Sequence, residues 1–195
     1  MKIVFATRNR DKIREIERIL DGLSVEIIDS MEFPNMPETI EDGETCVANA
    51  LKKAREVSHF TDLPALADDS GLFVEALDGQ PGVYSSRYAG PGCTYNDNND
   101  KLLKEMADIP SEERNAYFLC VAALVLPNGL EITREGRLNG AIAISKRGGS
   151  GFGYDPVFQL PDGRTIAEID TSEKNRISHR AKAFGAIRQA ISDLL

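Results

Sequence analysis

The hydrophobic pattern of the first twenty residues changes from that of a strand to that of a helix. Residues 2–6 are rich in β-branched and aromatic side chains, and Ile13, Ile16 and Leu20 then recur at helical spacing. Residues 25–28 favour a second strand, so the chain opens as a strand–helix–strand unit. This opening restricts the fold to the α/β class.

The later segments add further strands and helices to that opening. We expect the acidic stretch of residues 31–44 to be a loop, because it contains prolines and lacks periodicity. The pattern from Val47 predicts an amphipathic helix, with Asn49 and Lys53 opposite its apolar face. A strand over 63–67, a turn at Asp68–Gly71 and a strand over 72–77 are expected next. The remaining predicted elements are a helix over 96–106, a hairpin of strands 117–126 and 131–137, and a final helix over 178–195. No linker divides the chain, so the sequence predicts one domain over residues 1–195, a mixed β-sheet flanked by helices.

Composition excludes several classes of protein. Lysine and arginine number 23 and aspartate and glutamate 31, and this net charge of −8 disfavours binding to a nucleic-acid backbone. Three cysteines without a Cys-x-x-Cys pair argue against disulfides and thiolate zinc sites and favour a reducing cytosol. The longest apolar run, residues 116–126, is short of the ~20 residues that span a membrane. Residues 1–5 lack a signal-peptide cleavage site, and we expect a cytoplasmic protein.

The turn after the first strand is a candidate phosphate site. Unpaired amides at a helix N-terminus attract anions, and Thr7, Asn9 and Lys12 add a hydroxyl, an amide and a cation. The alternative is an ordinary helix cap with solvated basic residues.

Two adjacent carboxylates, Asp68 and Asp69, follow a buried strand. Burial of an unpaired carboxylate is costly, and Mg²⁺ would compensate it because this ion needs only one or two carboxylates besides substrate phosphates. Glu41 in the acidic loop is a candidate second ligand. The alternative is an Asp-Ser-Gly turn in which one aspartate caps backbone amides.

A glycine-rich stretch covers residues 148–153. It is not a P-loop, because Tyr154 stands where a P-loop needs lysine. It does not match the dinucleotide-binding Gly-x-Gly-x-x-Gly pattern either, because Tyr154 or Pro156 falls at the last glycine position. Phe152 between two glycines offers an aromatic face on which a purine could stack. The alternative is a flexible hairpin tip.

The segment before the final helix concentrates cations. Lys174 and Arg176 precede His179 and Arg180, and positive side chains at a helix start oppose the helix dipole. An anionic or carbonyl-rich ligand would relieve that conflict. The alternative is a solvated basic turn, whereas His59 is assigned to a structural role.

Taken together, these segments resemble the inosine/xanthosine triphosphate pyrophosphatases, which convert deaminated purine nucleoside triphosphates to the monophosphate and diphosphate. The similarity spans nearly the whole chain, and five motifs occur in the order and spacing of that family. They are Thr7-x-Asn9-x-x-Lys12, Asn49-Ala50 with Lys53-Ala54, Ala67–Leu72 followed by Pro81–Tyr88, Gly151–Pro156, and Glu173–Asn175 with Ile177–Arg180.

The resemblance implies roles for individual residues. Asp69 matches the general base, which is also a metal ligand, and Glu41 matches a second Mg²⁺ ligand. The residues matched to substrate binding are Thr7, Arg8, Asn9, Arg10, Asp11 and Lys12 in the opening turn, Lys53 and Ser70, and Phe152, Gly153, Tyr154, Asp155, Lys174, His179 and Arg180 toward the base.

The resemblance also implies an elongated mixed sheet with two lobes, an active-site cleft between them, and a homodimer. It implies Mg²⁺-dependent hydrolysis of ITP, dITP and XTP. One departure is Ala48, which stands where the family commonly has a glutamate. That glutamate would either close a capping box with Thr45 or act electrostatically near Mg²⁺.

Two other functions compete with this interpretation. A nucleotide-binding module could use the same turn and aromatic ring without hydrolysis, although paired carboxylates near a polyanion are repulsive unless a metal intervenes. A phosphohydrolase acting on pyrimidine triphosphates or sugar phosphates is the second alternative.

Overall fold

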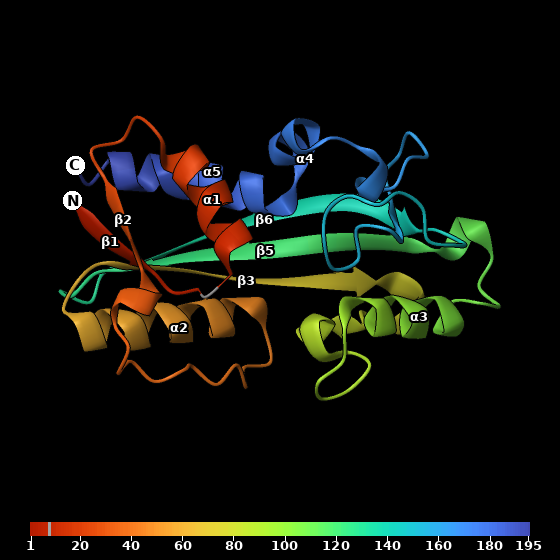
Figure 1. Cartoon of the computed structure of the whole chain (residues 1–195), viewed down its shortest axis with the longest axis horizontal. Helices are drawn as coiled ribbons and strands as arrows, with labels where there is room; N and C mark the ends of the chain where they lie inside the picture. Colours follow the sequence, from red (N-terminus) through yellow and green to blue (C-terminus); the bar gives the residue numbers. More distant parts are fainter. Residues whose placement is uncertain (8) are drawn as a thin grey trace. The chain divides into compact units, whose positions relative to one another are not determined.

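The computed structural model describes residues 1–7 and 9–195, and it has a mixed α/β fold. The helices are α1 (Arg10–Leu20), α2 (Cys46–Thr61), α3 (Tyr95–Glu105), α4 (Thr171–Ile177) and α5 (His179–Ser192). The strands are β1 (Lys2–Phe5), β2 (Glu26–Asp29), β3 (Ala65–Val74), β4 (Pro81–Gly82), β5 (Asn115–Val125), β6 (Glu131–Ile142) and β7 (Phe158–Gln159). The predicted mixed sheet flanked by helices is confirmed (Figure 1).

The chain forms two compact units, each assembled from separate segments. The first unit comprises Met1–Asp69, Cys120–Gly136 and His179–Leu195, and the second comprises Ser70–Leu119 and Arg137–Ser178. The boundaries fall inside β3, β5 and β6, so each of these strands contributes residues to both units.

The first unit has β1 near the middle of its sheet. The strand order there is β2-β1-β3-β5-β6, and β1 pairs in parallel with β2 and β3. Alternate side chains of a strand face opposite sides, so Ile3 and Phe5 enter one core while Val4 enters another. This burial on both faces explains why the first strand is apolar throughout.

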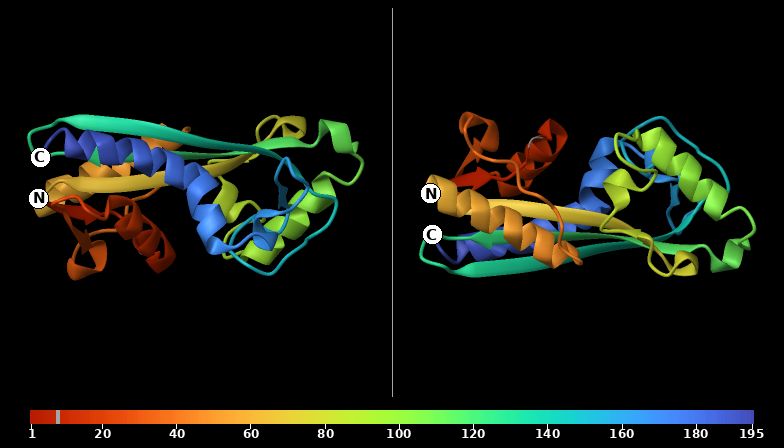
Figure 2. Two further views of the ribbon diagram at one scale, coloured as in Figure 1. Left: turned by 90° about the horizontal axis from the view of Figure 1, so that it is seen from above. Right: turned by 90° about the horizontal axis from the view of Figure 1, so that it is seen from below.

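Helices cover both faces of the first unit's sheet. α1 and α5 lie together on one face, where the ring of Phe5 meets that of Phe184 edge-on at 5.8 Å, and α2 runs along β3 on the other (Figures 1 and 2). The two termini lie close together in every view. No helix in the described ranges is both long and apolar enough to span a membrane.

The second unit has its own core. There β4 pairs with β3 and β7 pairs with β6, both antiparallel. Leu72, Leu102, Phe118 and Phe158 are among the residues that fill this core. The buried Arg114 donates hydrogen bonds to backbone carbonyls at four residues, which ties the start of β5 to its surroundings.

One local prediction was wrong, and one segment has structure that was not predicted. The expected turn at Asp68–Gly71 does not exist, because β3 continues through it from Ala65 to Val74. The basic segment, for which a solvated turn was the alternative interpretation, contains the short helix α4, capped by Asp170, whose carboxylate accepts from the Glu173 amide at 2.8 Å. By contrast, the predicted absence of regular structure at residues 148–153 is confirmed.

Candidate active site

The continuity of β3 determines where the two adjacent carboxylates point. Neighbouring side chains of a strand face opposite sides, so Asp68 turns toward α1 and α5 whereas Asp69 turns toward α2. Both are buried, with 1% and 7% of their surface exposed. Each therefore needs its own polar partners.

Cations from two helices surround Asp68. Lys12 of α1 places its Nζ 2.9 and 3.0 Å from the carboxylate oxygens, and Nε of Arg180 in α5 lies 3.4 Å away. Arg180 also donates to Glu15 at 2.9 Å. Burial alone would raise the pKa of Asp68, but Lys12, Arg180 and Lys53 together hold it well below its usual range. Asp68 is thus a permanent anion that collects the positive charges.

The surroundings of Asp69 are less positively charged. Asn49 Nδ2 donates to its carboxylate at 3.2 Å, and Lys53 Nζ lies 3.9 Å away. Burial raises the pKa of Asp69, and Lys53 only partly offsets this while the charge of Glu41 adds to it. The neighbouring Cys46 thiol stays protonated, because burial and the charge of Asp69 raise its pKa. Asp69 is accordingly the better proton acceptor of the two aspartates.

Lys53 joins the acidic loop to β3. Its Nζ donates to Glu41 Oε1 at 2.7 Å and to the Asp68 backbone carbonyl at 2.5 Å. Burial lowers the pKa of Lys53, but Asp68, Glu41 and Asp69 outweigh it, so its pKa is raised. The Lys53 ammonium therefore lies between Glu41 and Asp69, the two carboxylates that the resemblance implies for Mg²⁺.

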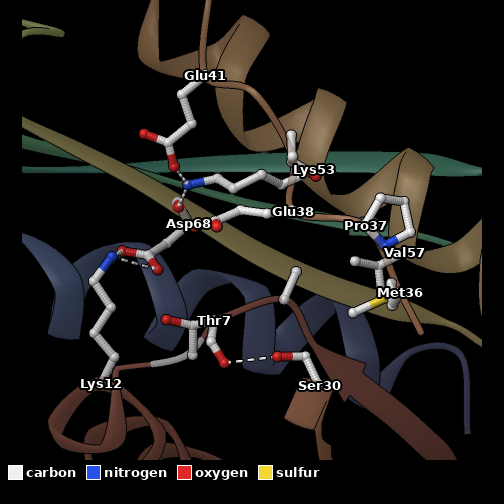
Figure 3. Close-up of a pocket in the computed structure, with 12 residues that line it drawn as sticks. Thr7, Lys12, Ser30, Met36, Pro37, Glu38, Glu41, Lys53, Val57 and Asp68 are labelled. Atoms are coloured by element: carbon white, nitrogen blue, oxygen red, sulfur yellow. Dashed lines mark hydrogen bonds and ion pairs between the residues drawn. The ribbon is translucent and has the colours of Figure 1, made fainter. Parts of the chain in front are cut away.

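A pocket of about 170 Å³ opens beside these groups, entirely within the first unit (Figure 3). Lys12 and Lys53 reach Asp68 from different sides. Ser30 Oγ donates to the Thr7 carbonyl at 2.8 Å, and both residues line the pocket. Such a pocket, with two lysines and a helix start at its wall, can accept phosphate groups.

The opening turn has the geometry of a helix cap. The Asn9 amide donates to Thr7 Oγ1 at 3.2 Å, and Asn9 Oδ1 accepts from the Lys12 amide at 3.3 Å. Arg8 lies outside the described residues, and Arg10 and Asp11 are placed only as the first residues of α1. The helix cap of the alternative interpretation therefore forms, but Lys12 is not a solvated cation, because it pairs with Asp68 and lines the pocket.

The glycine-rich stretch is ordered around one carboxylate in the second unit. Asp155 Oδ2 accepts from the Phe152 amide at 2.9 Å and from Lys174 Nζ at 2.6 Å. That ammonium also lies 4.4 Å from the centroid of the Phe152 ring. The Gly153 carbonyl accepts from Asn99 Nδ2 at 3.0 Å. The Tyr154 hydroxyl donates to the Ser85 carbonyl, so the stretch is a built loop rather than a free hairpin tip.

The predicted site residues thus form two groups. In the first unit the structure brings Lys12, Glu41, Lys53 and Asp69 around β3, and His179 and Arg180 begin α5. In the second unit it brings together the second group, which consists of Phe152, Gly153, Tyr154, Asp155 and Lys174. Ser70 follows Asp69 in β3.

Sequence reasoning paired Asp68 with Asp69 as carboxylates that Mg²⁺ would compensate, but it did not predict how Asp68 and Asn49 organise the first group. Asp68 was expected in a turn, and Asn49 was placed only on the face opposite the apolar side of α2, although it is 1% exposed. The unbroken run from Ala65 to Val74, which contains no proline, is the signal that could have indicated a strand through the aspartates.

The donor set is compatible with Mg²⁺. Among the described residues, no group of three or more His, Cys, Asp or Glu could hold a metal ion by itself. Mg²⁺ does not need such a group, because it is usually held by one or two carboxylates together with substrate phosphates and water. The Lys53 ammonium between Glu41 and Asp69 marks a position where positive charge is already stabilised.

Known proteins resemble the chain over nearly its full length. The model of the Ham1 family matches residues 3–190. A Geobacter sulfurreducens protein named dITP/XTP pyrophosphatase is 50% identical over 188 residues, which cover 96% of this chain and 94% of the relative. The solved structure of a HAM1 protein from Coxiella burnetii has a TM-score of 0.93 at 41% identity and covers 99% of both chains.

A second solved structure agrees with these findings. It is the nucleoside-triphosphatase, or dITP/XTP pyrophosphatase, of Mycobacterium abscessus, with a TM-score of 0.80 and 43% identity, covering 100% of this chain and 98% of that one.

Proposed function

Because the chain belongs to the Ham1 family, we propose that it is an enzyme that hydrolyses deaminated purine nucleoside triphosphates. The substrates are ITP, dITP and XTP, and the products are the nucleoside monophosphate and diphosphate. The reaction depends on Mg²⁺ and takes place in the cytoplasm, where it removes damaged nucleotides from the pool.

One observation carries this proposal. Lys12, Lys53, the buried Asp68 and the partly buried Glu41 line one pocket, in a chain 50% identical to a protein named dITP/XTP pyrophosphatase. Lysines alone would suit any anion. The buried aspartates beside them would repel a polyanion, and this conflict favours a site that also takes a divalent cation.

The residues divide the work by their protonation states. Lys12 and Lys53 line the pocket and stabilise the negative charge of the phosphates. Asp69, whose pKa is raised mainly by burial, accepts a proton from the attacking water. The water oxygen bonds to phosphorus, the bridging oxygen of the α–β linkage leaves with the diphosphate, and one proton is released. Such transfers need positioning and charge stabilisation more than covalent participation by the protein.

Glu41 and Asp69 are the residues that would hold Mg²⁺. When bound, the ion neutralises phosphate oxygens and so favours attack on phosphorus. Lys53 Nζ lies 2.7 Å from Glu41 and 3.9 Å from Asp69, so its ammonium is close to both proposed ligands.

Recognition of the base is assigned to the second group of residues. Phe152 offers its ring for stacking, and Lys174 beside that ring is a donor for a 6-keto oxygen. Adenine presents a 6-amino donor instead, so binding ATP would leave buried donors without acceptors. His179 and Arg180, both buried, are the further donors implied for the nucleotide.

A product assay tests the proposed reaction. The purified chain is incubated with ITP and Mg²⁺, and diphosphate and orthophosphate are measured separately beside the nucleotide products. We expect IMP and diphosphate in equal amounts, and no turnover when EDTA replaces Mg²⁺. Orthophosphate with IDP would refute the cleavage position, and binding without turnover would indicate a nucleotide-binding module.

A further inference from the structure

The buried amide of Asn49 connects the two carboxylates that we assign to Mg²⁺. Asn49 lies on the first turns of α2, and only 1% of its surface is exposed. On one side of it runs the acidic loop that carries Glu41, and on the other runs β3 with Asp69. No part of the proposed chemistry so far uses this residue.

Both ends of the amide are engaged. Asn49 Oδ1 accepts from the Gly43 amide at 2.8 Å, and Nδ2 donates to Asp69 Oδ2 at 3.2 Å. A longer contact of 3.5 Å joins Nδ2 to the Gly43 carbonyl. The Asn49 side chain therefore hydrogen-bonds to the loop backbone and to Asp69 at the same time. This requires a group with both a donor and an acceptor.

The loop approaches Asn49 as closely as its backbone permits. A Cβ added to Gly43 would lie 2.7 Å from Asn49 Oδ1 and 2.9 Å from Ala48 Cβ. Glycine at this position lets the main chain reach the amide, two residues after Glu41. This contact therefore sets how closely the loop approaches α2, in addition to the bond from Lys53 to Glu41.

The same loop has a second tie to the same helix, but at the surface. Lys52 Nζ donates to Asp42 Oδ1 at 2.6 Å, and both side chains are exposed to solvent in part or mostly. This ion pair holds the loop to α2 without touching Asp69. It provides a matched control for a general loosening of the loop.

We propose that Asn49 is a positioning residue for the metal site, which fixes the separation of Glu41 and Asp69 by bonding the Gly43 backbone and the Asp69 carboxylate together. The inference rests on the proposed function. Outer partners of metal ligands typically change metal affinity 10–100-fold when they are removed, and we expect an effect of this size.

Kinetics at varied Mg²⁺ concentration measure the effect. In Asn49→Ala we expect the Mg²⁺ concentration for half-maximal ITP hydrolysis to rise at least tenfold, with kcat at saturating Mg²⁺ within about threefold of the wild type. Gly43→Ala forces the loop off the amide from the other side and should raise the half-saturation concentration similarly. Lys52→Ala should leave it unchanged.

Hydrogen exchange of the free protein gives a readout independent of turnover. The Gly43 amide proton is bonded to Asn49 Oδ1, so it should exchange slowly in the wild type and in Lys52→Ala. In Asn49→Ala it should exchange at least tenfold faster. Melting temperatures show whether each variant is folded. If Asn49→Ala does not fold, Gly43→Ala still provides the kinetic test.

The outcomes separate this inference from the proposed function. Failure of the function is seen in the wild type alone, which would release no diphosphate. Failure of the inference is seen when an active wild type and its folded variants share one Mg²⁺ half-saturation concentration. Equal Gly43 exchange in wild type and Asn49→Ala would also overturn it, as would a Lys52→Ala variant as impaired as Asn49→Ala.

Discussion

Two buried aspartates at the site, Asp68 and Asp69, have pKa values that are shifted in opposite directions. Asp68 and Asp69 are adjacent in β3 and both buried, yet the pKa of one is held low by cations and the pKa of the other is raised. The strand geometry is the cause, because it turns the two carboxylates to opposite sides with different neighbours. Asp68 therefore holds the cations of α1 and α5, and Asp69 is the carboxylate that we propose to act on water.

The substitution Asp69→Asn tests that assignment. We expect kcat for ITP to fall at least ~100-fold, because the amide can neither accept the proton nor balance Mg²⁺. The fold should persist, since the Asn49 amide still finds an acceptor oxygen. Thermal unfolding measures the fold, and Asp42→Asn in the exposed part of the loop serves as the control. An Asp69→Asn variant with nearly full turnover would remove Asp69 from the mechanism.

Ala48 provides a second test at this scale. Thr45 caps α2 by accepting from the Ala48 amide at 3.1 Å, and the Ala48 side chain is exposed. Ala48→Glu should complete a capping box and stabilise the protein by a few tenths to ~1 kcal/mol. Thermal unfolding and Mg²⁺ titration are measured together. A higher melting temperature with an unchanged Mg²⁺ half-saturation is expected, whereas a changed half-saturation would favour the electrostatic role.

At the scale of elements, the site depends on contacts between segments far apart in the sequence. Asp68 of β3 meets Lys12 of α1 and Arg180 of α5, which come from opposite ends of the chain. Their pairing therefore contributes to the packing of both helices against the sheet. Removing one member of a buried ion pair leaves the others without a counter-charge.

Asp68→Asn should accordingly destabilise the protein by about 3 kcal/mol at pH 7, measured by denaturant unfolding. The pKa of Asp68 is lower in the folded chain, so its contribution is complete above the unfolded pKa of about 3.9 and is lost as pH falls toward the folded value. The difference between wild type and variant should therefore shrink below about pH 4. A difference that is absent at pH 7, or that grows in acid, would contradict this role.

Local patterns predicted most elements, but they did not predict that β3 continues through Asp68–Gly71. The apolar spacing from Val47 and the Thr45 cap correctly indicated α2, and the strand–helix–strand opening was right. Asp68–Gly71 was expected to be a turn because Asp, Ser and Gly favour turns. It is a strand because cations from α1, α2 and α5 compensate the carboxylates, and such distant partners leave no trace in a local pattern.

At the scale of the whole molecule, each unit contributes one of the two groups of predicted residues. The first unit holds the lysines and carboxylates, and the second holds the aromatic loop ordered by Asp155 and Lys174. The motifs that resemble a pyrophosphatase therefore form two groups of residues. The first group is suited to phosphates and the second to a planar ring. The homodimer implied by the resemblance stays a prediction.

Discrimination between substrates follows from this division. In the proposed function the first group of residues binds only the phosphates, which every triphosphate shares, so we expect selection to come from the donors near the base. We expect kcat/KM for ITP to exceed that for ATP by at least ~100-fold, since a buried donor facing an amino group loses its hydrogen bond. Lys174→Met should reduce this ratio chiefly by slowing ITP, while thermal unfolding shows whether it remains folded.

We propose that this chain cleaves deaminated purine triphosphates at the α–β linkage with Mg²⁺. The most direct test is a comparison of kcat/KM for ITP, dITP, XTP, GTP, ATP and UTP, with diphosphate measured as the product. We predict diphosphate release that is fastest with ITP, dITP and XTP and is abolished by EDTA. Comparable kcat/KM for ATP and ITP, or orthophosphate as the released product, would contradict the claim.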